Sequence, residues 1–149
     1  MAVGDIKNTE GFEIIYRAKG AGTIAAGDAV ALDANGLVIP ATATTMGKHG
    51  ILTGMTHVVG ATTYYGVLYR GRIVATAGGA LKPGDYVVSD ANADVVAMSE
   101  TLSATYVQAE AQTHQRVIGR YVRLESDNQY APSDAAATNA AIIQVGDTP

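Results

Sequence analysis

Residues 81–96 read LKPGDYVVSDANADVV, and residues 24–39 of the same chain read IAAGDAVALDANGLVI. A constant offset of 57 (84 − 27) superimposes seven identical pairs: Gly27/Gly84, Asp28/Asp85, Val30/Val87, Asp33/Asp90, Ala34/Ala91, Asn35/Asn92 and Val38/Val95. A match of this length at one offset indicates that a structural unit occurs twice in the chain. The repeated aspartates are then either a chemical site or part of the architecture.

Each copy of the repeat predicts a β-hairpin entered by a tight turn. In the second copy, Pro83 presets its own φ and Gly84 tolerates a positive φ, which suits the centre of a type II turn. The β-branched and aromatic residues at 86–88 and 95–97 predict two strands, and the short polar residues at 90–92 turn the chain between them. The glycine and aspartate of each copy are therefore interpreted as structural turn residues: Gly27, Asp28, Gly84 and Asp85.

The rest of the chain predicts a mostly β fold. Runs of β-forming residues bounded by Gly, Asn, Asp or Pro indicate further strands at residues 12–16, 64–69, 72–76, 117–124 and 142–145. Many short strands with glycine-rich corners are typical of a compact β-barrel or sandwich. We therefore expect a single domain over residues 1–149, in which residues 11–149 form the barrel or sandwich.

The segments that follow the two hairpins also match, with Gly54 aligned to Gly119 at an offset of 65 (119 − 54). The second copy is therefore expected to carry about eight extra residues (65 − 57) within residues 98–115. Apolar residues at helical spacing, Leu102 and Tyr106, favour a short helix there, while neighbouring β-branched residues favour a strand. At most one short helix is expected in the chain.

The N-terminal residues 1–10 predict an extended arm. They show neither helical nor alternating periodicity, and only Val3 and Ile6 offer apolar anchors. Ordering each residue costs about 1–2 kcal/mol in backbone entropy. We therefore expect the arm to order mainly on a partner, with Val3 and Ile6 as contact residues.

Composition narrows the possible functions. The charged fraction of 16% lies below the roughly 25% usual for soluble domains, which predicts a surface rich in small neutral residues, as at a broad protein contact. The formal net charge of −4 argues against nucleic-acid binding by phosphate neutralisation. No apolar run reaches the ~20 residues of a membrane-spanning helix, and acidic residues near the N-terminus argue against a signal peptide. We therefore expect synthesis in a cytoplasm and no membrane partner.

No motif predicts catalysis, a metal or a cofactor. The sequence has no cysteine, which removes thiolate sites. Asp90-x-Asn92-x-Asp94 begins like an EF-hand loop, but Val95 stands where that loop needs glycine and Thr101 where it needs glutamate. The three histidines are isolated, and neither GxSxG nor a phosphate loop occurs. The hairpin tips also lack the lysine of a lipoyl- or biotin-carrier domain, so we expect a protein that is not an enzyme.

The cluster Tyr69-Arg70-Gly71-Arg72 has two interpretations. Strand alternation places Arg70 and Arg72 on one face, with Tyr69 and Ile73 on the other. The two arginines then either contact an acidic partner surface or form the solvated face of a sheet whose other face is buried. Alternation by itself favours the solvated face.

Segments along most of the chain resemble a family of tailed-bacteriophage capsid decoration (cement) proteins. The matching segments are EGFEIIY (10–16), GAGTIAAGDAV (20–30), NGLVIPA (35–41), YRGRIV (69–74), VIGR (117–120) and the last apolar strand (140–146). The resemblance implies a small β-rich homotrimer that binds the outside of the capsid, with the major capsid protein as its partner and Val3, Ile6, Arg70 and Arg72 as candidate contacts. The insertion at 98–115 and the explicit internal repeat depart from the family pattern.

Two other classes of protein fit the same sequence. Another phage structural β-module, such as the base of a head fibre or a tail component, would share the turn chemistry and the small-residue surface. A small-molecule-binding barrel is the remaining alternative. The motifs of the resemblance are turn motifs, so a functional surface has to be found in the structure.

Overall fold

The structure is a computed structural model that describes residues 3–7, 11–98, 105 and 107–147. It confirms a compact, mostly β fold with one short helix among these residues. The elements in chain order are β1 (Glu13–Ala18), β2 (Ala29–Leu32), β3 (Val38–Pro40), β4 (Gly50–Val59), β5 (Thr62–Thr76), β6 (Tyr86–Ser89), β7 (Val95–Ala97), α1 (Gln108–Gln115), β8 (Gly119–Leu124) and β9 (Ala140–Val145).

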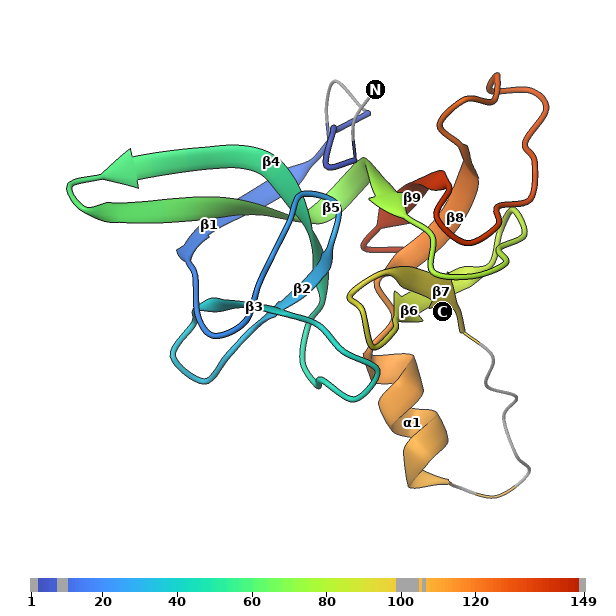
Figure 1. The fold of residues 1–149 in the computed structure, drawn as a ribbon. Coiled ribbons are helices and arrows are strands. Elements are labelled where there is room, and N and C mark those ends of the chain that lie inside the picture. Colours follow the sequence, from blue (N-terminus) through green and yellow to red (C-terminus); the bar gives the residue numbers. More distant parts are fainter. Residues whose placement is uncertain (1–2, 8–10, 99–104, 106, 148–149) are drawn as a thin grey trace.

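The described strands form one curled antiparallel sheet (Figure 1). Its order is β3-β2-β4-β5-β9-β8-β6-β7, and β1 pairs with the first half of β5. The order is nearly symmetric about its centre: β3, β2 and β4 at one end correspond to β7, β6 and β8 at the other end. The strand β5 is 15 residues long and pairs with β4 through its first half and with β9 through its second half. We call β1–β4 with the first half of β5 unit 1, and the second half of β5 with β6–β9 unit 2.

The entry turns of the two hairpins have the same hydrogen bonds. The backbone N–H of Asp28 donates to the carbonyl of Ala25 (3.0 Å), and the Asp28 carboxylate accepts from the Ala25 N–H (2.8 Å). Asp85 and Lys82 repeat these two contacts at 2.9 and 2.8 Å. The glycine before each aspartate has a positive φ, 90° in unit 1 and 93° in unit 2. The interpretation of these residues as turn-forming is consistent with this geometry.

The hairpin tips are also alike. Asp33 accepts hydrogen bonds from the backbone N–H groups two and four residues later, at 2.8 and 2.9 Å. Asp90 does the same at 2.8 and 3.0 Å. The left-handed residue that closes the tip is Gly36 in unit 1 (φ 76°) and Ala93 in unit 2 (φ 62°). A side chain in this conformation costs about 1–2 kcal/mol, so the second tip is the more strained one.

The strands after the hairpins correspond in a different register from the predicted one. Val30 pairs with Gly50 in unit 1, and Val87 pairs with Gly119 in unit 2. Gly50 rather than Gly54 is therefore the equivalent of Gly119, at an offset of 69 (119 − 50). Two equivalent hydrogen bonds of 2.9 Å agree with this offset: Leu52 N–H to Asp28 O and Tyr121 N–H to Asp85 O. The predicted register was wrong because GILTG has a glycine at each end, and the sequence does not show which end meets the hairpin.

The corrected register gives unit 2 twelve extra residues (69 − 57) instead of eight. The helix α1 lies in this insertion, which agrees with the expected place for a short helix. Leu102 and Tyr106, on which the predicted helical face rested, lie outside the described residues.

Two clusters of buried side chains form the core. The larger cluster joins both units across β5, and its bulkiest members are Ile51, Leu68, Ile73, Leu81, Ile118, Tyr121 and Ile143. The smaller cluster lies in unit 1 and contains Val30, Val38, Leu52, Val67 and Tyr69. Because the larger cluster crosses the boundary between the units, they bury apolar surface together.

Candidate functional site

Arginines from two strands line a surface groove, which we call the arginine groove. Arg70 and Arg72 come from β5 and Arg120 comes from β8, and the groove has a volume of about 500 Å³. Both β5 arginines are exposed, whereas their neighbours Tyr69 and Ile73 are 3% and 0% exposed. The alternation predicted for this stretch is therefore confirmed, and the two arginines lie beside a third that the sequence did not associate with them.

The pairing of the strands explains how the arginine groove is assembled. Arg72 and Arg120 both pair with Gln144 of β9, so these side chains form one row across β5, β9 and β8. Gln144 Oε1 accepts a hydrogen bond from Arg72 Nε (3.0 Å). After β9, Gly146 turns the chain with φ 86°, and Asp147 Oδ2 then lies 2.6 Å from Arg120 Nε. Three arginines and one aspartate give the groove a charge of +2 (3 − 1), opposite in sign to the net charge of the chain.

A second hollow of about 340 Å³ continues the arginine groove, because the two share Arg70 and Gly146 as lining residues. Lys48 lines this hollow, with its Nζ 4.8 Å from the centre of the Tyr69 ring. Glu13 of β1 lines it as well and pairs with Arg70 across the sheet. A cation over an aromatic face is worth about 0.5–1 kcal/mol at an exposed site, so the Lys48 ammonium is held near the groove.

A second candidate surface is an apolar ribbon that extends beyond the core (Figure 1). From Gly54 onward every residue of β4 is exposed. Val59 pairs with Thr62, so the hairpin turns through Gly60 and Ala61 alone. The large exposed apolar side chains here are Phe12 (45%), Tyr16 (39%), Met55 (41%), Val58 (62%) and Val59 (58%). We call residues 12–18 and 54–65 the projecting ribbon.

Apolar side chains of the projecting ribbon meet across its strands. The Tyr16 hydroxyl of β1 lies 4.0 Å from the Met55 sulfur of β4, which places both on the same side of the intervening β5. Strand alternation adds Val59 to the side that carries Met55. Within the described residues, the second edge of β1 pairs with no strand. An open strand edge beside exposed apolar side chains is a template for pairing with another chain.

Residues 3–7 lie against β5 of the same chain, which corrects the predicted arm. The segment is not a continuous extended arm, because residues 3–4 form a turn in which Gly4 has φ 86°. Ile6 forms a β-bridge with Ile73 and packs against the core. Val3 lies over Gly27, where an added Cβ would come 2.7 Å from the Val3 Cβ. Three backbone hydrogen bonds hold the segment: Gly4 N–H to Val74 O (2.6 Å), Val74 N–H to Asp5 O (3.1 Å) and Lys7 N–H to Arg72 O (2.8 Å). The expectation that Val3 and Ile6 find no hold on their own domain was wrong, because backbone pairing stabilises the segment in addition to its apolar side chains.

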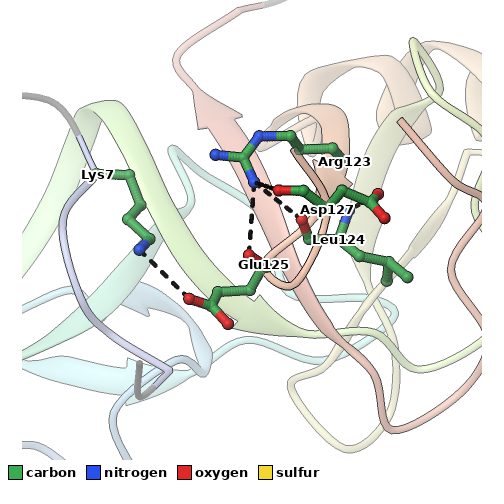
Figure 2. Close-up of polar contacts among 5 residues, drawn as sticks. All are labelled: Lys7, Arg123, Leu124, Glu125 and Asp127. Carbon is green, nitrogen blue, oxygen red and sulfur yellow. Dashed lines mark hydrogen bonds and ion pairs between the residues drawn. The ribbon is translucent and has the colours of Figure 1, made fainter. Parts of the chain in front are cut away.

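An ion pair ties the same segment to unit 2 (Figure 2). Lys7 Nζ lies 3.4 Å from Glu125 Oε1, and the two side chains are 12% and 21% exposed. The turn that carries Glu125 is itself held by Arg123, whose Nη1 donates to the carbonyl oxygens of Leu124 (3.1 Å), Glu125 (3.5 Å) and Asp127 (2.9 Å). These polar groups therefore have a structural role. Residues 8–10 of the predicted arm lie outside the described residues.

The loop after this turn is anchored by Asp127 and Tyr121. The Asp127 carboxylate accepts from the Ser133 N–H (2.8 Å), the Ser133 hydroxyl (2.9 Å) and the Leu124 N–H (2.9 Å), and these hydrogen bonds lower its pKa. Tyr121 is 1% exposed and donates its hydroxyl proton to the Ser133 carbonyl (2.6 Å). Burial and then the charges of Asp127 and Asp134 raise the pKa of Tyr121 to about 12.

The structural turn residues differ in their surroundings. In unit 1, Gly27 is buried. Burial of the Asp28 carboxyl raises its pKa and the charge of Asp94 raises it further, while the hydrogen bond from the Ala25 N–H lowers it. In unit 2, Gly84 is exposed and lines the arginine groove, next to Asp85. Of the two turns, only the turn in unit 2 therefore lines the arginine groove.

One buried histidine lines the hollow that continues the arginine groove. His49 is 3% exposed, and its Nε2 lies 2.9 Å from the Thr45 carbonyl oxygen. Burial is the largest cause that lowers its pKa, and the charge of Arg116 adds to it.

Among the described residues, no three His, Asp or Glu side chains lie close enough together to hold a metal ion. None of the helices in the described residues is long and apolar enough to cross a membrane.

Sequence reasoning missed two parts of these surfaces. Arg120, Gln144 and Asp147 were not associated with the two β5 arginines, because their meeting depends on the pairing of β9 with two distant strands. The outer part of β4 was missed as well. Its signal was present: β-forming residues flank Gly60, the positive-φ residue of a two-residue hairpin turn.

Comparisons of this chain with protein-family models, with curated proteins and with solved structures find no match.

Proposed function

We propose that this protein is a bacteriophage head decoration (cement) protein that forms a homotrimer, binds the outer surface of the capsid and bridges major capsid subunits. The proposal gives it no enzymatic activity and no nucleic-acid or membrane partner, and places it on the exterior of the virion after synthesis in the host cytoplasm. It draws on the sequence segments that resemble this family and on the surfaces of the fold.

The projecting ribbon is the observation that carries the proposal. Val58 and Val59 are 62% and 58% exposed on a hairpin that reaches away from the core. Clustered exposed apolar side chains on a monomer mark protein contacts. The open edge of β1 lies beside them. A contact between copies through this ribbon would bury Val59 together with Tyr16 and Met55 on one face, cover Val58 on the other face, and pair that edge.

Self-association and capsid binding need different surfaces, and the chain offers two. We assign the projecting ribbon to contacts between copies, and Arg70 and Arg72 to the capsid. Val3 and Ile6 pack on their own domain, so they are not part of the proposed contact. Association costs about 4–15 kcal/mol in lost freedom of motion, and a trimer meets that cost with three linked footprints through effective concentration.

Light scattering and capsid sedimentation test the proposal together. The 15.3 kDa chain should behave as a trimer at micromolar concentration, and the double substitution V58K/V59K should give a folded monomer. The matched control is A136K/A137K, which places the same two charges at exposed residues outside the ribbon and should leave the trimer intact. Wild-type protein should co-sediment with expanded capsids of a phage that carries this gene. A monomeric wild type, or a wild type that stays in the supernatant, would contradict the proposal.

A further inference from the structure

We propose that the arginine groove binds an extended acidic segment of a partner protein, and that Asp147 of this chain occupies part of the groove until such a segment displaces it. The inference deepens the proposed function and rests on it for the identity of the partner.

The row of donors across the sheet sets the spacing of the ligand. Neighbouring strands lie about 4.8 Å apart, so Arg72 and Arg120, on either side of Gln144, are about 10 Å apart at their Cα atoms. Along β5, Arg70 and Arg72 are two residues apart, or about 6.6 Å in an extended strand. Alternate side chains of an extended peptide have this second spacing. Acidic residues at positions i and i+2 would therefore meet Arg70 and Arg72 together.

The contact of Asp147 with Arg120 shows that a carboxylate fits the groove. Its Oδ2 lies 2.6 Å from Arg120 Nε, slightly closer than the roughly 2.7–2.9 Å of a typical charge-assisted N–H···O hydrogen bond. The two side chains are 36% and 46% exposed, and exposed ion pairs are worth about 0–1 kcal/mol. An incoming carboxylate can therefore replace Asp147 at little cost. The Arg70 guanidinium makes no ion pair or hydrogen bond with the residues that the structure describes, so it is available to the same ligand.

The charge of the groove favours a short acidic segment over a nucleic acid. The groove carries +2 while the whole chain carries −4, so a long polyanion that extended beyond the groove would meet a repulsive surface. Guanidinium groups bind carboxylates in a planar, two-pronged geometry. The groove is also open and elongated, since Arg70 and Gly146 connect it to the hollow beside Lys48.

Fluorescence anisotropy with a labelled peptide of alternating Glu and Ser tests the inference. We expect the peptide to bind at 50 mM salt, and the peptide with Gln in place of Glu not to bind. The double substitution R70Q/R72Q should lower the affinity tenfold or more. The control substitution K19Q removes one charge from an exposed lysine whose Nζ donates to the neighbouring Gly20 carbonyl and should leave the affinity unchanged. D147N should raise the affinity about threefold, because it removes the resident competitor.

Several outcomes would overturn the inference. Equal binding of the Glu and Gln peptides, or an unchanged affinity in a folded R70Q/R72Q protein, would show that the arginines do not recognise carboxylates. Displacement of the peptide by millimolar phosphate would identify a general anion site, and a change of oligomeric state in R70Q/R72Q would identify a contact between copies. The peptide experiment contains no capsid. Peptide binding without capsid sedimentation would therefore overturn the proposed function alone, whereas capsid sedimentation without peptide binding would overturn only this inference.

Discussion

Unit 1 and unit 2 use the same register to build opposite environments. In unit 1 the row Ile14–Leu68–Ile51 crosses β1, β5 and β4, and Leu68 and Ile51 are 0% exposed in the shared core. The equivalent row in unit 2 is Arg72–Gln144–Arg120, which lines the arginine groove. The turns and the strand pairing are common to both units, so they determine the fold. The units differ in whether this row is buried in the core or lies on the surface, and the exposed row in unit 2 forms the arginine groove.

The two units also differ in what joins their last strands. A two-residue turn joins β4 to β5, and the hairpin projects as an apolar ribbon. A longer segment joins β8 to β9 and is folded back by Asp127 and Tyr121. Substitutions at equivalent positions of the two units can therefore show which residues the common turn and strand-pairing pattern needs. They can also show which residues only one unit needs.

The largest expected effect is at the glycines that begin β8 and β4. A Cβ at Gly119 would overlap the carbonyl oxygen of Gln144, and a Cβ at Gly50 would lie 2.7 Å from the equivalent carbonyl, that of Leu68. We expect Gly119→Ala to lower the free energy of unfolding by about 3 kcal/mol or more and Gly50→Ala by slightly less, because a ladder carbonyl cannot move without losing its hydrogen bond. Urea denaturation measures both. Gly54→Ala is the control, because nothing lies within 4 Å of its added Cβ. Equal stability of all three variants would contradict the equivalent close contacts at Gly119 and Gly50.

The next effect separates the two entry turns. Gly27→Ala and Gly84→Ala each force alanine to a φ near 90°, which costs about 1–2 kcal/mol. At Gly84 no atom lies within 4 Å of the added Cβ, whereas at Gly27 it meets Val3. Thermal unfolding should therefore show a larger loss for Gly27→Ala. If the loss were larger at Gly84, the packing of residues 3–7 on unit 1 would be in doubt.

A third prediction concerns Tyr121, whose equivalent in unit 1 is Leu52. Tyr121→Phe removes the hydrogen bond to the Ser133 carbonyl and should cost about 1 kcal/mol. The pKa of Tyr121 is raised from 10.0 to about 12, so its contribution to stability is complete below pH 10 and is lost as the pH rises towards 12. The stability difference between wild type and Tyr121→Phe should therefore shrink over this interval. Urea denaturation at pH 9 and pH 11.5 measures it, and a constant difference would contradict the shifted pKa.

The smallest expected effect compares the two turn aspartates. Asp85→Ala removes the acceptor of the Lys82 N–H and should cost about 1 kcal/mol. Asp28→Asn keeps an acceptor for the Ala25 N–H and removes a charge whose burial raises the pKa. A raised pKa means that the contribution of Asp28 is present below its usual value of 3.8 and is lost as the pH rises through the folded-state value. Asp28→Asn should therefore be neutral or stabilising at pH 7 in thermal unfolding; a clear loss of stability there would show that the Asp28 carboxylate has a further partner.

Local chemistry explains which parts of the fold the sequence could predict. Turn residues act on their own backbone, so the repeat Gly-Asp-x-Val-x-x-Asp-Ala-Asn was enough to place both hairpins and to assign Asp28 and Asp85 to the turns. Alternation at Tyr69–Ile73 acts over neighbouring residues too, and it placed Arg70 and Arg72 on one face. The position of Gly71, with φ 125°, inside one continuous strand was not visible from the sequence.

Features that depend on distant partners could not be predicted from the sequence. Gln144 joins Arg72 to Arg120 only because β9 lies between β5 and β8, and that order is a property of the whole sheet. Residues 3–7 were predicted to need another molecule, since their apolar side chains are few. Their stabilisation comes largely from hydrogen bonds to β5 and from the pairing of Lys7 with Glu125, 118 residues away.

The sharing of β5 has a consequence for how the chain folds and unfolds. A fragment that ends with β5 would keep unit 1 but leave residues 71–76 without β9, and a fragment that begins after β5 would leave β9 without its inner neighbour. Neither half can therefore be separated with a complete set of backbone hydrogen bonds. The amide protons of the buried part of β5, from residue 66 onward, should exchange with solvent only when the whole chain opens. The protein with its repeated unit should then behave as one cooperative body instead of two domains in series.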